Sequence, residues 1–203
     1  WTILWDEKYK GRLSQYDSVD GAVLVAALVA GVKDPFHMTD EELAGVKELL
    51  VKQRDVLRFW WTEQSSVEQS IASGELIAAY AWNDAVVRLK KAGVPVEYMN
   101  PKEGIFTWFC GLVKAKNGPG DENAAYDLVN AMLETRVGVW LIDNFGYGHS
   151  NRKTFDQVSK ERLQELGIMS PEALFTSGIF FAEMDNAIRE RYIAMFEQVK
   201  AGG

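Results

Sequence analysis

Trp82 and Asp84 stand where a sheet would present them to a ligand. They follow the apolar run of residues 76–81, which predicts a buried strand, and precede an amphipathic helix expected over residues 84–92. Ligands of open α/β sheets bind beyond the carboxyl ends of the strands. An indole face and a carboxylate at that edge suit an alkylammonium group or another flat or cationic ligand. The alternative is that Asn83 or Asp84 only caps the helix and Trp82 belongs to the core.

A second set of candidate residues lies in the aromatic run of residues 104–116. If this run is one extended segment, Trp108 and Cys110 lie on one side of it and Phe109 on the other, because side chains alternate along a strand. A nucleophilic cysteine needs a nearby base, and the one reasonable candidate is His149, with no triad spacing to support it. We therefore expect Cys110 to be a buried, inert thiol.

A third candidate is Tyr147, which stands between Gly146 and Gly148 in the segment NFGYGHSN. Glycines at such positions let the backbone approach a ligand closely. The same glycines are equally consistent with a simple helix end and turn. The segment lacks the third glycine and the following helix of a dinucleotide-binding loop, so nucleotide binding is not expected.

The elements that must position these residues alternate between strands and helices. Thr39 and Glu42 form a capping-box pattern at the start of one helix, and Asp17 or Ser18 can cap an earlier one. Strands are expected at about residues 12–16, 56–61, 76–81, 94–99 and 104–116. Helices are expected over roughly residues 22–30, 39–54, 64–72, 84–92, 121–134, 136–144 and 192–203, among others after residue 151. This alternation indicates an α/β fold with a largely parallel sheet.

Composition narrows the function classes. The chain has 203 residues, is 47% apolar and carries a formal net charge of −7 without a basic block, so a nucleic-acid partner is not expected. It contains one cysteine and two histidines, so neither an internal disulfide nor a structural zinc site is expected, and we expect no cofactor. No apolar run is long enough to cross a bilayer.

The chain resembles the periplasmic solute-binding proteins of the spermidine/putrescine ABC-transporter class. The resemblance lies in the order of the segments SGELIAAYAWNDA, PVEYMNPKEGIFTWFCGLVKAKN and AAYDLVNAMLETRVGVWLIDNFGYGHSN, and it covers essentially all 203 residues. The most specific piece is PKEG followed by an aromatic-rich strand. The resemblance implies an α/β, periplasmic-binding-protein-like (type II) lobe with a mostly parallel sheet, here a fragment of a two-lobed protein that holds its ligand in a cleft.

The same resemblance implies a non-catalytic function. Such proteins capture polyamines in the periplasm with aromatic side chains and carboxylates, and deliver them to the membrane permease of an ABC transporter. Position by position, Trp82 matches a tryptophan of the cleft, Trp108 a second aromatic wall, and Tyr147 a tyrosine of the other lobe. Ser65 and Ser66 lie in a loop where some relatives offer a polar contact.

Two departures leave the ligand open. Cys110 stands where polyamine binders place an aspartate that pairs with an ammonium group. Ser18 and Gly21 stand where they place acids, although Asp17 is close by. Asp84 could supply a carboxylate instead. The solute is therefore expected to be polyamine-like or another, less cationic amine.

Relatives are also longer, and the resemblance places the missing part, with its signal peptide, before Trp1. Residues 1–104 and 150–203 would then form the second lobe, and residues 105–149 would be a returning segment of the first. Apolar side chains of that segment would be exposed, which predicts a homodimer or altered packing; they are Phe106, Trp108, Val139 and Trp140. The alternatives are an α/β enzyme of unknown reaction that uses Asp84, His149 and Cys110, or a truncated fragment without a competent site.

Overall fold

The computed structural model describes residues 1–168, 170, 172, 175–176 and 178–202, which form two compact units. Unit 1 comprises residues 1–82, 101–104 and 182–203, and unit 2 comprises residues 83–100 and 105–181. These boundaries do not coincide with those predicted for the two lobes, and the lobe assignment stays a prediction. Among the described residues, no helix has both the length and the apolar character needed to cross a membrane.

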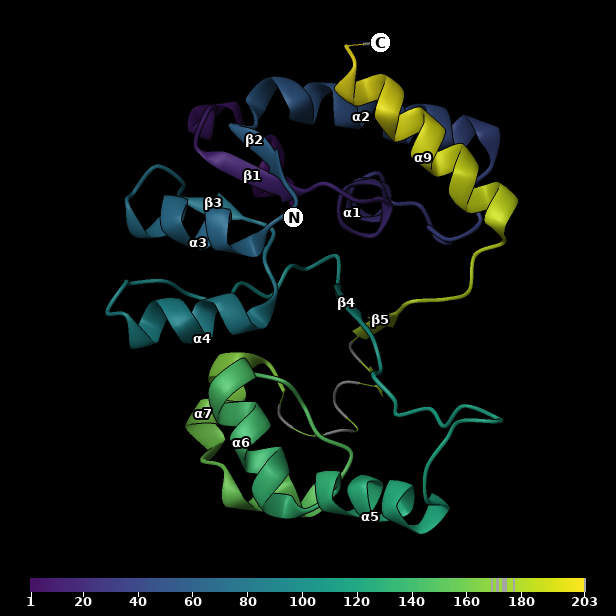
Figure 1. The fold of residues 1–203 in the computed structure, drawn as a ribbon. Helices are drawn as coiled ribbons and strands as arrows, with labels where there is room; N and C mark the ends of the chain where they lie inside the picture. Colours follow the sequence, from purple (N-terminus) through teal and green to yellow (C-terminus); the bar gives the residue numbers. More distant parts are fainter. Residues whose placement is uncertain (169, 171, 173–174, 177, 203) are drawn as a thin grey trace. The chain divides into compact units, whose positions relative to one another are not determined.

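A three-stranded parallel sheet organises unit 1 (Figure 1). Its central strand is β1 (Leu13–Tyr16), flanked by β2 (Phe59–Trp61) and β3 (Ala78–Ala79). Tyr16 is the register partner of Trp61, so the last residues of β1 and β2 lie side by side. Because all three strands run in the same direction, their carboxyl ends meet at one edge of the sheet.

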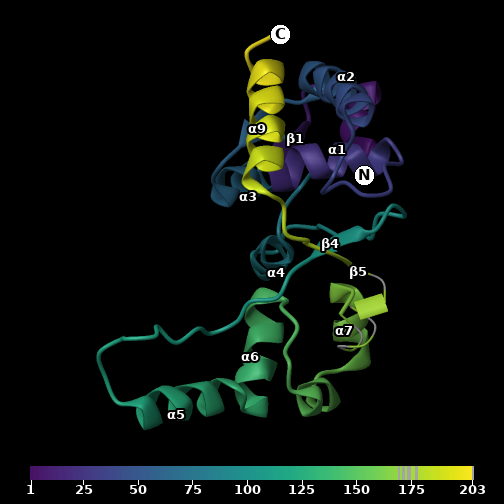
Figure 2. The same ribbon diagram turned by 90° about the vertical axis from the view of Figure 1, so that its right-hand side faces the viewer.

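Helices cover this sheet. Short 3₁₀ turns, η1 (Thr2–Trp5) and η2 (Glu7–Tyr9), precede β1, and a π-helical turn, η3 (Val19–Val23), leads into α1 (Leu24–Val29). Residues 22–27 are fully buried, which confirms the expected core helix. The long helices α2 (Asp40–Val56) and α9 (Asn186–Lys200) pack against each other (Figures 1 and 2). Helix α3 (Gln64–Ala72) connects β2 to β3.

Two predicted helix caps of unit 1 are confirmed. The Ser18 hydroxyl accepts a hydrogen bond from the Gly21 backbone at 2.9 Å, so Ser18 rather than Asp17 caps the turn. Thr39 and Glu42 exchange both hydrogen bonds of the capping box. Such caps satisfy backbone N–H groups that have no partner inside the helix, which fixes where the helix begins.

Unit 2 is mostly helical, with a two-stranded parallel ladder of β4 (Ile105–Thr107) and β5 (Gly178–Phe180). Its helical elements include α4 (Asn83–Lys91), α5 (Glu122–Met132), α6 (Thr135–Phe145), the 3₁₀ turn η4 (Arg152–Gln157) and α7 (Lys160–Leu166). The side chains of its buried core come from α4, α6, η4, α7 and the second residue after α7; they are Val87, Ile142, Phe155, Leu163, Leu166 and Ile168. This core holds α4 against α6, the two helices that flank the candidate site.

Several strand predictions were too long. Only Ile105–Thr107 of the run 104–116 is a strand, and only Ala78–Ala79 of the run 76–81. Residues 94–99 form no strand, although their side chains alternate between exposed and half-buried. Pro95 has no N–H to donate to a ladder, which disfavours pairing there. The α/β class and the parallel pairing of the strands are confirmed.

Candidate ligand-binding site

Four aromatic side chains gather at the carboxyl edge of the unit 1 sheet, and we name Tyr16, Trp61, Tyr80 and Trp82 the sheet-edge aromatic group. The ring of Tyr16 stacks on Trp61, with ring centroids 4.4 Å apart. Trp82 meets Tyr16 and Trp61 edge-on, at 5.5 and 5.6 Å. Edge-on and offset arrangements of this kind are the favoured ones for aromatic pairs. The strands thus place one aromatic surface where α/β proteins bind ligands.

A hydrogen bond from its backbone holds Trp82 in place. The Trp82 backbone N–H donates to the Gln64 side chain at 2.8 Å, which ties Trp82 to the start of α3. Trp82 is half-buried while Trp61 is 1% exposed, so Trp82 is the more accessible of the two indoles. Contact between Trp82 and a ligand stays a prediction.

Three of the four polar residues predicted at this end of unit 1 make structural contacts, and the fourth, Ser65, is exposed. Asp17 pairs with the Lys200 ammonium at 2.7 Å, and the Ser18 hydroxyl caps η3. Ser66 donates to the Glu63 carbonyl at 2.7 Å, and Ser65 is exposed on α3. Their roles in ligand contact stay predictions.

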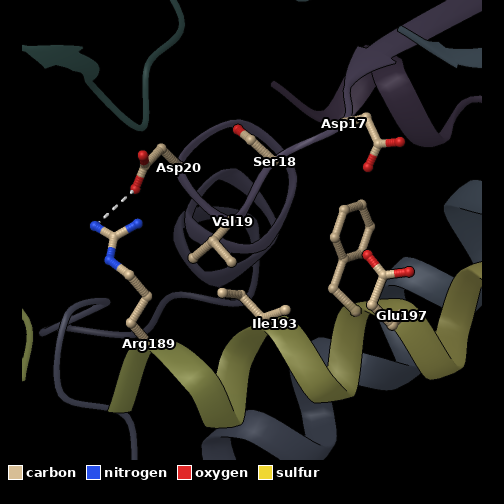
Figure 3. A pocket seen from close by; sticks show the side chains of 8 residues that line it. Asp17, Ser18, Val19, Asp20, Arg189, Ile193 and Glu197 are labelled. Carbon is tan, nitrogen blue, oxygen red and sulfur yellow. Dashed lines mark ion pairs between the residues drawn. The ribbon is translucent and has the colours of Figure 1, made fainter. Parts of the chain in front are cut away.

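Asp17 and Ser18 also line an open hollow of about 280 Å³ between η3 and α9 (Figure 3). Its apolar floor includes Val19 and Ile193. Carboxylates of the hollow have cationic partners on α9: Asp20 lies 3.5 Å from Arg189, and Lys200 pairs with Asp17. This balance of charge makes the hollow a weak attractor for a free cation.

The structure brings the other four predicted residues together in unit 2. Tyr147 meets Trp108 edge-on with ring centroids 6.5 Å apart, and the pKa of its phenol is raised by burial and by the negative charges that Asp84 and Cys110 carry when ionised. A fifth residue, which we did not predict, joins them: Arg88 donates a hydrogen bond to Asp84 at 2.7 Å and also acts on the phenol. We name these five residues the Tyr147 cluster: Asp84, Arg88, Trp108, Cys110 and Tyr147.

Local structure at Gly146 explains how Tyr147 reaches this place. Gly146 ends α6 with a left-handed φ of 67°, and a Cβ there would lie 3.1 Å from Leu166 and 3.4 Å from Asn83. A side chain at this position would be both strained and crowded. The Asn83 amide donates to the Gly146 carbonyl, which joins the start of α4 to the residue before Tyr147. The predicted helix end is therefore correct, and it also positions the tyrosine.

Burial is the main cause that raises the pKa of Tyr147 above its usual value of 10.0, and the negative charge of Asp84 adds to it, while Arg88 acts in the opposite direction. Burial acts in this direction because the phenolate loses hydration when water is excluded. The phenol is therefore neutral throughout the physiological range of pH. A neutral phenol can donate a hydrogen bond as well as accept one.

The prediction that Cys110 is buried was wrong, because its thiol is exposed. Burial depends on what packs over residues 108–116, and these residues lie largely on the surface. The His149 ring has other partners: Nδ1 accepts from the Asn151 backbone N–H at 3.1 Å, and Nε2 lies 3.0 Å from the Met132 carbonyl. This network assigns His149 a structural role in the loop after α6. Within the described residues, no group of three or more His, Cys, Asp or Glu is arranged to hold a metal ion.

Arg88 could have been predicted from the sequence. Asp84 and Arg88 are four residues apart on a predicted helix, a spacing that brings opposite charges together on one face. Tyr16, Trp61 and Tyr80 were missed for a different reason. Each ends or follows a short strand, and only the sheet order shows that the three strand ends adjoin.

Comparisons with known proteins agree with this architecture. A family model described as "Bacterial extracellular solute-binding protein" matches residues 1–148. The chain is 26% identical over 205 residues to spermidine/putrescine-binding periplasmic protein 1 of Haemophilus influenzae, covering 99% of this chain and 54% of the relative. It is 23% identical over 202 residues to the spermidine/putrescine-binding periplasmic protein of Escherichia coli K12, covering 100% of this chain and 57% of the relative. The chain thus spans about half the length of these curated relatives.

Solved structures show the same fold. The spermidine/putrescine ABC-transporter substrate-binding protein PotD of Streptococcus pneumoniae superposes with a TM-score of 0.73 at 17% identity, covering 99% of this chain and 61% of that one. A GABA receptor superposes with a TM-score of 0.66 at 21% identity, covering 97% of this chain and 61% of that one. The expected periplasmic-binding-protein-like fold and its partial length are confirmed. By its sequence over residues 1–148 and by its fold, the chain belongs to the bacterial extracellular solute-binding protein family.

Proposed function

We propose that the protein captures a small amine-bearing solute in the periplasm, without chemical conversion, and delivers it to the permease of an ABC transporter. The names of its relatives support an amine, because spermidine, putrescine and GABA all carry one. The same names describe binding proteins and a receptor rather than enzymes. We also propose that a signal peptide lies in a region before residue 1.

The observation that carries the proposal is the Tyr147 cluster. It combines two aromatic rings with a carboxylate that lies at the first turn of α4. Aromatic faces attract ammonium groups, and a carboxylate gives them a charge-assisted hydrogen bond. The sheet-edge aromatic group supplies unit 1 with a second surface of the same chemistry. Trp82, Ser65, Ser66, Asp17 and Ser18 are proposed as further contacts on unit 1.

Titration calorimetry of the 203-residue chain with putrescine, spermidine and 4-aminobutanoate tests this function. Binding of at least one amine at a stoichiometry near one is expected, with the solute recovered unchanged. Trp108→Ala should weaken that binding at least tenfold. Phe109→Ala is the matched control, because Phe109 is the next residue but is 69% exposed and stacks on Phe180 instead. Absence of binding by every amine, or conversion of the bound one, would overturn the proposal.

The lobe assignment and self-association are further proposals. Trp108 and Trp140 are 41% and 55% exposed, which supports an apolar surface on unit 2. Phe106 does not contribute to it as predicted, because it is 4% exposed and stacks on Phe181. Light scattering at increasing protein concentration tests self-association, and a constant monomer mass would exclude it.

A further inference from the structure

The side chain of Gln64 joins α3 to the more accessible indole of the sheet-edge aromatic group. Gln64 is the first residue of α3 and is 8% exposed. Its carboxamide oxygen accepts a hydrogen bond from the Trp82 backbone N–H at 2.8 Å, and its carboxamide nitrogen donates to the Glu68 carboxylate at 3.2 Å. A backbone N–H only donates and an ionised carboxylate only accepts, so one orientation of the carboxamide satisfies both partners.

The bond to Trp82 continues the hydrogen bonding of the sheet beyond its last strand pair. The Tyr80 backbone N–H donates to the Ser14 carbonyl at 3.1 Å, across from β3 to β1. In a strand, N–H groups two residues apart face the same neighbour. The N–H of Trp82 is the next in this series, but it meets the side chain of Gln64, since β1 ends at Tyr16. A side chain of α3 thus holds the backbone one step past the sheet.

Backbone and ring contacts together orient the Trp82 indole. The ring meets Tyr16 and Trp61 edge-on, with ring centroids 5.5 and 5.6 Å apart. Trp82 is also the last residue of unit 1, so the chain leaves this unit directly after the contact with Gln64. The hydrogen bond therefore sets the direction of the Trp82 side chain at the point where the sheet no longer does.

Resting on the proposed function, we infer that Gln64 is a positioning residue for solute binding, which fixes the backbone of Trp82 and thereby the direction in which the indole meets the solute. Glu68 holds the carboxamide in the orientation that accepts from Trp82. Gln64 acts through Trp82 and needs no contact of its own with the solute. The inference deepens the proposed function by adding a residue behind the aromatic surface.

Fluorescence tests the positioning without any solute. Gln64→Met keeps the length and helix propensity of the side chain but removes both polar atoms. The emission of Trp82 is the difference between each chain and the same chain carrying Trp82→Phe. In Gln64→Met this difference emission should move to longer wavelength and be quenched more strongly by acrylamide. Gln69→Met is the control, because Gln69 is an exposed glutamine of the same helix. An unchanged difference emission in Gln64→Met would overturn the inference and leave the proposed function standing.

An exchange of two side chains tests whether the hydrogen bond is the cause. Gln64→Glu alone places a second carboxylate beside Glu68 and should alter the Trp82 emission as Gln64→Met does. Adding Glu68→Gln should restore the wild-type emission, because a carboxylate at position 64 accepts from both the Trp82 N–H and a carboxamide at position 68. The summed charge of the two positions is then that of the wild type. A double variant that stays as altered as Gln64→Glu would overturn the role of the bond.

Titration calorimetry with putrescine, spermidine and 4-aminobutanoate measures the consequence for binding. Gln64→Met should weaken binding of each amine that the wild type binds by about threefold to tenfold, the order of one hydrogen bond. The double variant should return to within about twofold of the wild type, and Gln69→Met should match it. Unchanged binding in Gln64→Met would overturn the inference. Binding of no amine by the wild type would overturn the proposed function and, with it, the role of Gln64 in binding.

Discussion

The indole N–H of Trp61 donates a buried hydrogen bond of 3.0 Å to the backbone carbonyl of Tyr80. Trp61 ends β2 and Tyr80 follows β3, and β1 lies between these two strands in the sheet. The indole therefore spans the end of β1, where the ring of Tyr16 stacks on it. This hydrogen bond joins the ends of the two outer strands directly, in addition to the backbone hydrogen bonds that link each of them to β1.

Trp61→Phe should destabilise the protein while keeping an aromatic ring at this position. Loss of the buried hydrogen bond is expected to lower the free energy of unfolding by about 1 kcal/mol, with a further cost for the smaller ring. Urea unfolding followed by circular dichroism measures the change. Trp60→Phe is the control, because Trp60 is half-buried on the same strand and packs edge-on against Phe196. Equal losses in the two variants would contradict the assigned role.

Two glycines inside helices should respond to alanine with opposite signs. A Cβ at Gly138 in α6 would lie 2.3 Å from the Thr154 hydroxyl and 2.7 Å from the His149 ring, so Gly138→Ala should cost about 1–3 kcal/mol by overpacking. A Cβ at Gly45 in α2 would meet nothing within 4 Å. Gly45→Ala should therefore stabilise the protein by roughly 0.5–1 kcal/mol through helix propensity. Thermal unfolding of both variants checks the signs.

Glu165 should make the stability of the protein depend on pH. Hydrogen bonds from Lys90 and Arg162 lower its pKa below 4.5 in the folded protein. This stabilisation is therefore present above the pKa of the unfolded chain and is lost as the pH falls through the folded pKa. Because the Glu165 side chain is 35% exposed, we expect only about 0.5–1 kcal/mol.

The measurement compares the free energy of unfolding of Glu165→Gln with that of the wild type between pH 7 and pH 3. The wild type should be the more stable at neutral pH, and the difference should shrink as the pH falls through the folded pKa of Glu165. Glu161→Gln serves as the control, because Glu161 is an exposed residue of the same helix. A difference that grows in acid would show that the sign is wrong.

Tyr147→Phe tests the contribution of the hydroxyl to binding separately from that of the ring. The variant keeps the edge-on aromatic contact with Trp108 but removes the only polar atom of the side chain. We expect it to weaken binding of the amine that the chain binds by roughly tenfold, the order of one hydrogen bond to a charged group. Calorimetry with putrescine, spermidine and 4-aminobutanoate measures this, and unchanged binding would contradict a role of the hydroxyl.

Helix positions were predicted well because their signals are local. The capping box at Thr39 and the cap at Ser18 each depend on residues within four positions, and both form as expected. Strand lengths were predicted poorly because a ladder depends on a partner distant in sequence. The run after Phe106 has strand-like residues, yet only residues 105–107 have a partner, β5, which lies about seventy residues later.

For the candidate site too, features set by nearby residues could be predicted and features set by distant packing could not. The resemblance nominated Asp84, Trp108, Cys110 and Tyr147 as ligand contacts, and that role stays a prediction. The exposure of Cys110 was predicted wrongly, since burial is set by neighbours that no local pattern identifies. Arg88 was detectable from helical spacing alone, but its proximity to Tyr147 depends on the packing of α4 against α6.

Lys200, the last residue of α9, forms an ion pair with Asp17, the residue that follows β1. The Lys200 ammonium lies 2.7 Å from Asp17, 2.8 Å from Glu197 and 5.0 Å from the centre of the Phe196 ring. Asp17 directly follows Tyr16, so this ion pair holds the end of α9 beside the sheet-edge aromatic group. Truncation of the chain before Lys200 would remove the ion pair with Asp17. A dye attached just after Lys200 would report movement of Tyr16 while leaving the aromatic side chains unchanged.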